Sequence, residues 1–316
     1  GKQDNERLME LKFVATEKDE GRELLRVLRG DMALSAALVR KLKVRGGIFV
    51  NSRPAYTNYR LSPGDVVTCS LDLAEEDSDI VPERGEIDII YEDEWLLAVH
   101  KPSGQLSHPS RARYTGTLAN YVSCYLGGVC HAVNRLDRDT SGIVLFAKSS
   151  YAKARAAEAL REDGEKEYLA LAYGSFENKK GTIDAPIKRL RERDMRRGVC
   201  EDGERAVTHY KVLGERICFG EPVSALRLRL ETGRTHQIRV HCEYLGHPLL
   251  GDVLYYTPES RALSEKLGIN AQALHAFRLC FNHPFTGERL ELVCPLKRSE
   301  LRPFFENNIG FSGFMA

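Results

Sequence analysis

The sequence predicts an α+β protein in which a small α/β domain precedes a larger domain built around a mixed, largely antiparallel sheet. Two observations support this prediction. The charge balance shifts abruptly near residue 72, as expected at a domain boundary. After that point, strand-like and helix-like runs do not alternate strictly, as they would in a doubly wound parallel sheet. The length of 316 residues is typical of about two domains.

The composition excludes several classes of protein. With 46 Lys and Arg against 45 Asp and Glu, the net charge is +1, and 42% of the residues are hydrophobic, so the chain is neither disordered, collagen-like nor a coiled coil. No window approaches the roughly 18 consecutive apolar residues of a membrane span. The eight cysteines are scattered singly. We therefore expect a cytoplasmic protein that has no metal and does not bind membranes.

The charge distribution sets the predicted domain boundaries. Nine basic residues stand against three acidic ones between Arg22 and Cys69, whereas eleven acidic residues stand against one basic residue between Asp72 and Glu94. The acidic stretch also contains a proline and a glycine, which is typical of a linker. We predict a first domain over residues 1–72, an acidic linker over 73–86 and a second domain over 87–316.

In the first domain, Ser35 is a suitable cap for a helix that ends at Gly46 and Gly47. A strand-like Ile48-Phe49-Val50 and a turn at Asn51 follow directly. This arrangement of a helix, a basic turn and a short hairpin with Val-Asn-Ser-Arg-Pro-Ala resembles the S4 family of small RNA-binding domains over roughly residues 20–72. The resemblance implies RNA contacts from the basic turn. A solvated basic surface that suits the helix dipole is the alternative. The basic residues are Arg40, Lys41, Lys43 and Arg45.

In the second domain, strand-like and helix-like runs are mixed irregularly. The predicted strands are Ile87–Tyr91, Trp95–Val99, Gly142–Ala147 and Val223–Leu230. The predicted helices are Leu118–Leu126 and Tyr151–Arg161.

Three polar segments interrupt these apolar runs. The first is Asn134–Gly142, where Thr140-Ser141-Gly142 predicts a turn into a strand. This turn places Asp137 on a loop near the edge of the sheet. A surface charge cluster is the alternative interpretation of this segment. In the third, Lys166–Gly174, Tyr168 is predicted to be a core aromatic residue whose hydroxyl reaches a partner.

The second polar segment is Gly233–His241. We expect Thr235 to cap a helix that runs to Leu245, with Arg239 at the edge of its buried face. His236 and His241 are five positions apart, which fits no common zinc motif. Both histidines are expected to be hydrogen-bonded scaffold or phosphate contacts. The predicted buried residues of the helix are Ile238, Cys242 and Leu245.

Together, these segments resemble the RluA family of pseudouridine synthases over roughly residues 86–305. The matching motifs are Asn-Arg-Leu-Asp before Arg138, Gly-Arg-Thr-His-Gln-Ile-Arg ending at Arg239, Lys101-Pro102-Ser103-Gly104, Gly246–Asp252 and Leu274–Ala276. Asn134 stands where many members have His. The resemblance implies a catalytic domain of the pseudouridine synthase type, and an S4-like domain ahead of it further resembles the branch that modifies large-subunit ribosomal RNA.

The resemblance also implies the roles of the site residues. Asp137 is the expected catalytic aspartate, Tyr168 the active-site tyrosine and Arg239 the basic partner of the aspartate. A positively charged neighbour favours the ionised form of a carboxylate in a dry pocket. The expected substrate-binding residues of this domain are Arg135, Arg234, His236 and Gln237.

The implied reaction breaks the bond from ribose to uracil N1 and rejoins the base through C5, so it consumes nothing and needs no cofactor. The carboxylate can attack C1′ or C6 or act as a base at C2′, and the sequence leaves this choice open. The uracil must leave its stack. We expect Arg135 to fill the vacated space or bind the displaced phosphate, and Tyr168 to stack on the base or help remove the C5 proton. Further phosphate contacts, or a flexible charged loop, are expected at Lys188, Arg189, Arg191, Arg193, Arg196 and Arg197.

Other functions are also compatible with parts of the sequence. The chain could be a non-catalytic S4-type RNA-binding protein, or a synthase that acts on tRNA. A hydrolase that uses Asp137 with Asp139 is disfavoured, because residues i and i+2 of an extended segment point to opposite faces. The expected partner is RNA, and we expect a monomer.

Overall fold

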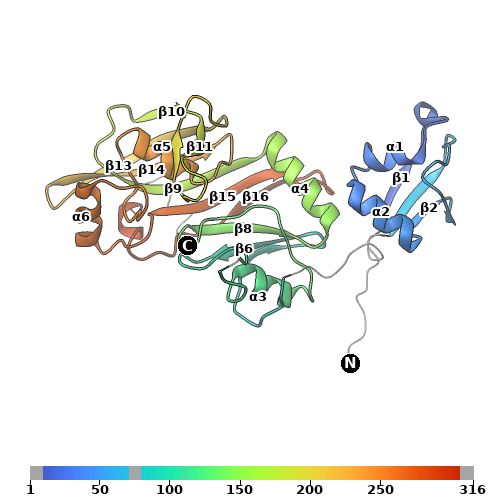
Figure 1. Cartoon of the computed structure of the whole chain (residues 1–316), viewed down its shortest axis with the longest axis horizontal. Helices are drawn as coiled ribbons and strands as arrows, with labels where there is room; N and C mark the ends of the chain where they lie inside the picture. The colour runs from blue at the N-terminus through green and yellow to red at the C-terminus, as the bar shows by residue number, and fades with distance from the viewer. Residues whose placement is uncertain (1–9, 71–79, 111, 307–316) are drawn as a thin grey trace.

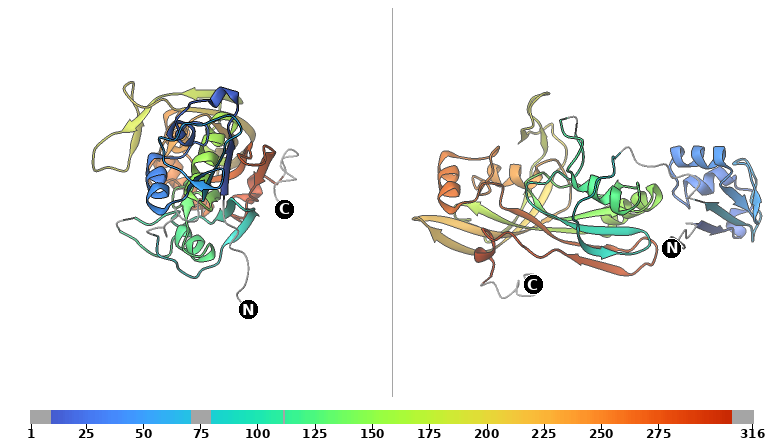
Figure 2. Two further views of the ribbon diagram at one scale, coloured as in Figure 1. Left: turned by 90° about the vertical axis from the view of Figure 1, so that its right-hand side faces the viewer. Right: turned by 90° about the horizontal axis from the view of Figure 1, so that it is seen from below.

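The computed structural model describes residues 10–70, 80–110 and 112–306 (Figure 1). A small N-terminal unit lies beside a larger unit that contains a ten-stranded sheet, which confirms the predicted fold class (Figures 1 and 2). Tyr151 of the larger unit is buried with the core of the small one, and Phe285 packs against the same cluster. No helix of the described residues has the length and apolar character needed to cross a lipid bilayer.

The N-terminal unit is a small α/β fold. Its four strands have the order β1-β4-β2-β3, and the pairs are antiparallel. The hydroxyl of Ser35 accepts a hydrogen bond from the Leu38 N–H at 3.1 Å, and Gly46 ends the helix in the left-handed conformation at φ 68°, as predicted. The elements are β1 (Glu10–Val14), α1 (Leu24–Arg29), α2 (Ala36–Arg45), β2 (Ile48–Val50), β3 (Arg53–Pro54) and β4 (Val66–Ser70), with a 3₁₀ turn at Glu17–Asp19.

The large sheet has the order β10-β13-β14-β9-β15-β8-β6-β5, with β16 paired to β15 and β7 paired to β8. Neighbours are antiparallel except β15 and β8, which run parallel among the described strands. The four predicted strands agree with the observed ones to within about two residues. The strands are β5 (Asp88–Glu92), β6 (Leu96–Lys101), β7 (His131–Ala132), β8 (Ser141–Ala147), β9 (Glu165–Tyr173), β10 (Lys180–Asp184), β13 (Val207–Cys218), β14 (Glu221–Leu230), β15 (Leu274–Asn282) and β16 (Arg289–Val293).

Helices cover both faces of this sheet, which explains the continuous apolar run of β8. Ile143 and Leu145 pack with α4, whereas Val144 and Phe146 pack with α3. Further along the sheet, Ala170 of β9 packs with α5 and Leu171 packs with α6. The helices are α3 (Leu118–Tyr125), α4 (Ser150–Asp163), α5 (Gln237–Tyr244) and α6 (Pro258–Leu267), with a 3₁₀ turn at Arg302–Phe304.

The start of α5 differs from the sequence prediction. The helix begins at Gln237, and its N-cap is His236 in the left-handed conformation at φ 58°, not Thr235. The Gln237 side chain satisfies the preceding turn, since its oxygen accepts a hydrogen bond from the Arg234 N–H at 3.0 Å. Because α5 ends at Tyr244, Leu245 is the C-cap and is 37% exposed instead of buried.

Part of the predicted acidic linker is packed against the larger unit. The Asn120 side chain of α3 donates a hydrogen bond to the Val81 carbonyl at 2.9 Å, and the Glu83 N–H donates to the Asn120 carbonyl at 3.1 Å. Residues 80–83 therefore lie along α3. Residues 73–79 of the predicted linker lie outside the described residues.

A buried histidine connects the centre of the sheet to the strand that begins after the Asp137 loop. His275 of β15 is fully buried, and its Nε2 donates to the Cys294 carbonyl at 2.9 Å, which leaves Nδ1 to accept from the Ser141 hydroxyl at 2.8 Å. Burial lowers the pKa of His275 to about 3. The neutral ring is therefore the form that fits this position.

This histidine predicts an acid-dependent loss of stability. The unfolded chain takes up a proton at His275 near pH 6.5, whereas the folded chain does so only near pH 3, so acidification favours unfolding between these values. In His275→Gln, we expect the free energy of unfolding to depend less steeply on pH between about 6 and 4, by up to about 1.4 kcal/mol per pH unit. Urea unfolding across this range measures the difference. Parallel curves for the two proteins would contradict it.

Candidate active site

The loop that carries Asp137 lies between β7 and β8 and is held by the segment that follows β6. The fully buried Lys101 donates from Nζ to the carbonyls of Pro102, Gln105 and Arg138 at 2.9, 2.8 and 2.7 Å. The Ser103 hydroxyl donates to the Asp139 carbonyl at 2.7 Å. Lys101 belongs to the Lys101-Pro102-Ser103-Gly104 motif, and its sequence context alone predicts no role for it. In the structure it fixes the backbone of the Asp137 loop.

The strand after this loop requires a glycine. Gly142 has a φ of +128°, and a Cβ at this position would clash with the backbone of Ala276 on the parallel strand β15. Close approach of β8 and β15 therefore places the loop directly beside β15 and its neighbour β9, which carries Tyr168.

Asp137 faces an arginine that a second, buried carboxylate holds in place. Arg239 of α5 donates from Nη1 to Asp137 Oδ2 at 3.1 Å. Its Nε and Nη2 donate to the two oxygens of Asp252 at 2.7 and 2.9 Å. Asp252 is 4% exposed, and its Oδ1 also accepts the N–H groups of Leu254 and Tyr255, both at 2.9 Å. Arg239 is thus fixed by Asp252 and presents Nη1 to Asp137.

The carboxylates around Arg239 stabilise its charged form. Burial opposes the charge of Arg239, but the hydrogen bonds and charges of Asp252 and Asp137 outweigh it and raise the pKa of the guanidinium above its usual value. Arg239 is 6% exposed, whereas the Asp137 side chain is 32% exposed. The aspartate is therefore the accessible end of a buried charge pair.

His236 stands on the other side of the Asp137 carboxylate. The Tyr255 hydroxyl accepts the Arg197 N–H at 2.8 Å and donates to His236 Nδ1 at 2.9 Å, so His236 Nε2 carries the proton in the neutral ring. This nitrogen lies 3.8 Å from Asp137 Oδ1. Burial lowers the pKa of His236, against the opposing charge of Asp137. A neutral N–H donor therefore faces the carboxylate.

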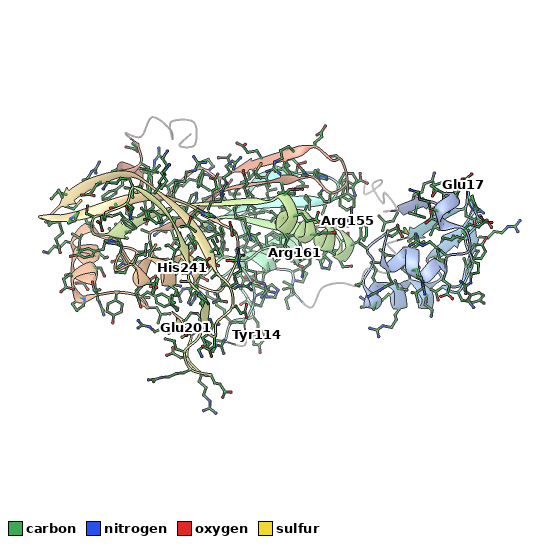
Figure 3. All side chains as sticks on the ribbon, turned by 90° about the horizontal axis from the view of Figure 1, so that it is seen from above. Glu17, Tyr114, Arg155, Arg161, Glu201 and His241 are labelled. Atoms are coloured by element: carbon green, nitrogen blue, oxygen red, sulfur yellow. The ribbon has the colours of Figure 1, made fainter. Side chains whose placement is uncertain are left out.

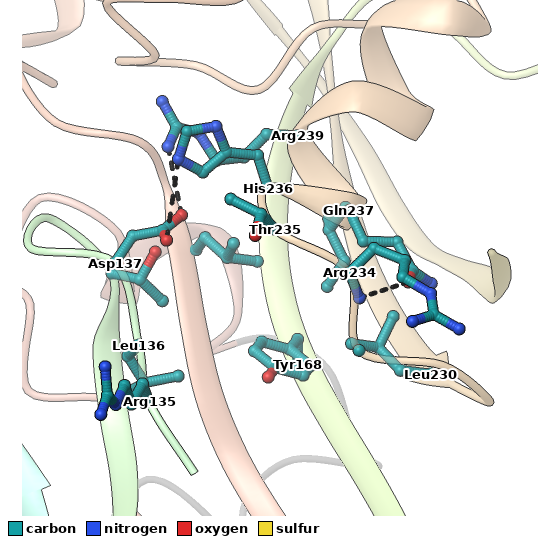
Figure 4. Close-up of a pocket in the computed structure, with 14 residues that line it drawn as sticks. Arg135, Leu136, Asp137, Tyr168, Leu230, Arg234, Thr235, His236, Gln237 and Arg239 are labelled. Carbon is teal, nitrogen blue, oxygen red and sulfur yellow. Dashed lines mark hydrogen bonds and ion pairs between the residues drawn. The ribbon is translucent and has the colours of Figure 1, made fainter. Parts of the chain in front are cut away.

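A cavity of about 450 Å³ opens between Asp137 and Tyr168 (Figure 4). Tyr168 lies on β9, and burial, together with the charge of Asp137, raises its pKa to about 12. Its hydroxyl has no hydrogen bond to another described residue, so the predicted partner is absent from the described part of the chain. Leu230 and Leu274 complete the apolar part of the wall. The cavity combines a carboxylate, a neutral phenol ring and apolar surface, which suits a flat polar ring such as uracil.

The predicted substrate-binding residues of this domain all line the cavity, but their surroundings differ. Arg135 is exposed and has no hydrogen bond or ion pair to another described residue. Arg234 is exposed and donates to Glu204 at 2.6 Å and to the Arg205 carbonyl at 2.9 Å.

Gln237, in contrast, is buried, and its side-chain amide forms hydrogen bonds with other protein groups. Its oxygen accepts from the Thr232 hydroxyl at 2.8 Å, and its nitrogen donates to the Val207 carbonyl and the Thr208 hydroxyl, both at 3.0 Å. The structure therefore favours a scaffold role for Gln237 over the substrate contact that we predicted. His241 is likewise a scaffold residue, bonded to Thr208 at 2.8 Å and to the Ala185 carbonyl at 2.9 Å.

The predicted phosphate contacts lie on two separate elements. The basic run after Lys188 forms a hairpin of β11 (Ile187–Arg189) and β12 (Arg197–Val199). Arg196 pairs with Glu243 at 3.0 Å, whereas Arg191 and Arg193 at the turn are exposed and have no ion pair among the described residues. The other basic group is on α2, where Arg40 and Lys43 are exposed, Lys41 is partly buried, and the side chain of Arg45 lies outside the description.

Asp139 is not placed to act together with Asp137. The carboxylate of Asp139 accepts both Nε and Nη2 of Arg138 at 3.1 Å, so it is engaged on its own neighbour and not paired with Asp137. Within residues 10–70, 80–110 and 112–306, no group of three His, Cys, Asp or Glu side chains is placed to hold a metal ion.

Comparison with known proteins agrees with this arrangement. The family model described as RNA pseudouridylate synthase matches residues 95–244. A relative described as the uncharacterized RNA pseudouridine synthase YhcT of Bacillus subtilis is 40% identical over 90% of this chain and 93% of its own length. The ribosomal large subunit pseudouridine synthase D of Vibrio parahaemolyticus is 36% identical over 81% of this chain and 79% of its own length. The structure of human RNA pseudouridylate synthase domain containing 1 has a TM-score of 0.56 and 30% identity over 68% of this chain and 86% of its own.

The fold and these relatives define the class of the protein, an isomerase that acts on RNA. Within that class, the chain belongs to the RluA family of RNA pseudouridine synthases.

The anchoring of Arg239 predicts a large loss of stability when Asp252 is changed. In Asp252→Asn, Arg239 remains buried without its full counter-charge, and we expect the free energy of unfolding to fall by roughly 3–5 kcal/mol. Arg138→Ala is the control, because it breaks an ion pair whose arginine is 58% exposed and should cost less than about 1 kcal/mol. Denaturant unfolding compares the two. Equal, small losses would mean that Asp252 does not hold Arg239.

Proposed function

We propose that Asp137 is the catalytic aspartate of this synthase and that its target is a uridine of large-subunit ribosomal RNA. The observation that carries the first part is the hydrogen bond from the Asp252-anchored Arg239 to Asp137, at the mouth of a cavity that Tyr168 closes. A partly exposed carboxylate beside a base-sized cavity is the group that the isomerisation needs. The name of the Vibrio relative supports the choice of RNA.

In this proposal, the uridine leaves its stack and enters the cavity with the ribose toward Asp137. The raised pKa of Tyr168 keeps its phenol neutral, so stacking on the uracil is a role it can fill without ionising. Arg135 has no protein partner among the described residues and is therefore free to occupy the vacated stack or to bind the displaced phosphate. Arg239 stays on the protein side, where its hydrogen bond holds the Asp137 carboxylate at the cavity.

Asp137→Asn tests this role. The amide keeps the shape of the side chain but is not a nucleophile, so we expect pseudouridine formation to disappear while the Kd for RNA changes by less than about threefold. The matched control is Asp139→Asn, two residues away, which should keep activity within about tenfold of the native protein. Pseudouridine mapping in ribosomal RNA from cells with each variant gives the readout. Full modification by Asp137→Asn would exclude the proposed role.

The N-terminal unit is proposed to be an S4-like RNA-binding domain. Its exposed Arg40 and Lys43 are three residues apart on α2, so they lie on the same face of the helix. The logarithm of RNA affinity falls linearly with the logarithm of salt concentration, with a slope of about 0.7 to 0.9 per phosphate contact. Removing a basic side chain that contacts a phosphate reduces the slope by that amount.

We therefore expect Arg40→Ala with Lys43→Ala to weaken RNA binding and to reduce the salt slope by up to about 2. Arg26→Ala with Arg29→Ala removes the same charge from α1 of the same unit and is the control. Binding isotherms at several salt concentrations compare the two double variants. If both reduce the slope equally, the effect comes from net charge and not from a phosphate site on α2.

A further inference from the structure

A second cavity, of about 620 Å³, adjoins the one that holds Asp137 and Tyr168. The two cavities share a wall, because the same residues of the Asp137 loop and of α5 line both of them. The shared residues are Arg135, Leu136, Asp137, His236 and Arg239. Anything bound in the second cavity therefore lies directly beside the reacting nucleotide.

The second cavity has an apolar lining with two unusually exposed members. Met195, in the turn between β11 and β12, is 69% exposed, and Val253, directly after Asp252, is 64% exposed. These two side chains come from separate segments and line the same cavity, together with Leu106, Pro109 and Leu254. In Figure 3, the hairpin near Glu201 and the loop near Tyr114 project from the same side of the domain. Single exposed apolar residues are ordinary, but these two line the same cavity and so offer apolar surface to a ligand there.

Polar groups in this cavity are placed to read the edge of a flat ligand. Gln272 is 2% exposed, and its nitrogen donates to the Thr140 hydroxyl at 3.2 Å, while its side-chain oxygen has no hydrogen bond to another described residue. His108 lies within 3.2 Å of the Pro109 carbonyl through Nδ1, which leaves Nε2 as an acceptor. Apolar walls with a few polar groups are typical of nucleobase pockets.

Because the substrate is RNA, the expected occupant of the second cavity is a part of the same RNA strand. The protein acts on RNA, and a base that enters the first cavity brings the next nucleotide of the strand within one phosphate of the shared wall. The exposed Arg135 of this wall and the exposed Arg138 of the second cavity suit the connecting phosphate. We propose that the second cavity binds a nucleobase that neighbours the target uridine in the same RNA, and that it selects sites by the identity of that neighbour. This inference rests on the proposed role of Asp137.

The test compares two double variants of the full-length chain. Met195→Ser with Val253→Ser removes the apolar mouth of the cavity, whereas Ile217→Ser with Phe219→Ser removes side chains of 64% and 66% exposure that line neither cavity. A site is first identified by pseudouridine mapping. Short RNAs that contain this site, with each of the four bases beside the target in turn, are then assayed under single-turnover conditions.

We expect the native protein and the Ile217/Phe219 variant to prefer particular bases at one neighbouring position by about tenfold or more. The Met195/Val253 variant should lose most of this preference, and Met195→Ser alone should lose part of it. An unchanged preference in the Met195/Val253 variant, or equal rates for all four bases with the native protein, would overturn the inference.

A binding measurement separates this inference from the proposed function. With 2-aminopurine in place of the neighbouring base, the native protein and Asp137→Asn should change its fluorescence on binding, and the Met195/Val253 variant should not. If Asp137→Asn abolishes catalysis but the fluorescence never changes, only the second cavity is misassigned. If Asp137→Asn remains fully active, the proposed function fails, whatever the fluorescence shows.

Discussion

The pairing of Arg239 with the buried carboxylate of Asp252 is the interaction on which the arrangement of the site depends. The Arg239 guanidinium donates three hydrogen bonds to carboxylates, two to Asp252 and one to Asp137. Since Asp252 is itself held by two backbone N–H groups, the guanidinium cannot turn away from the cavity without leaving a buried charge unpaired. Asp137 can therefore be more exposed than its partner and still keep a fixed counter-charge.

The sheet brings this pair to the cavity. Close packing of β8 on β15 at Gly142 and the three carbonyl bonds of Lys101 fix the Asp137 loop. Arg239 comes from α5, and Asp252 comes from the segment that follows this helix. Tyr255 joins the β11–β12 hairpin to the site, because its hydroxyl bonds Arg197 and His236 and its ring lies 5.1 Å below the Arg239 guanidinium. The hairpin that bounds the second cavity is thus tied to the residues around Asp137.

Local sequence signals predicted much of this structure. The caps of α2, the turn before β8 and the alternation of β14 depend on neighbouring residues, so the chain itself reveals them. The role of Asp252 could not be found in this way, because its partner lies 13 positions earlier and only the fold brings the two together. The start of α5 was misplaced for a similar reason. A threonine beside an apolar run predicts a cap, but hydrogen bonds of Gln237 to β13 move the helix start past His236.

The most direct test of the central claim is the pH dependence of the single-turnover rate in Arg239→Ala and Arg239→Lys at saturating enzyme. If Arg239 is the counter-charge of Asp137, its removal makes the carboxylate easier to protonate, so the acid limb should move to higher pH and the rate should fall steeply. Arg239→Lys keeps the charge without the planar fork and should recover part of the rate. An unchanged pH profile and single-turnover rate, with a loss only in RNA affinity, would show that Arg239 is a phosphate ligand and contradict the account.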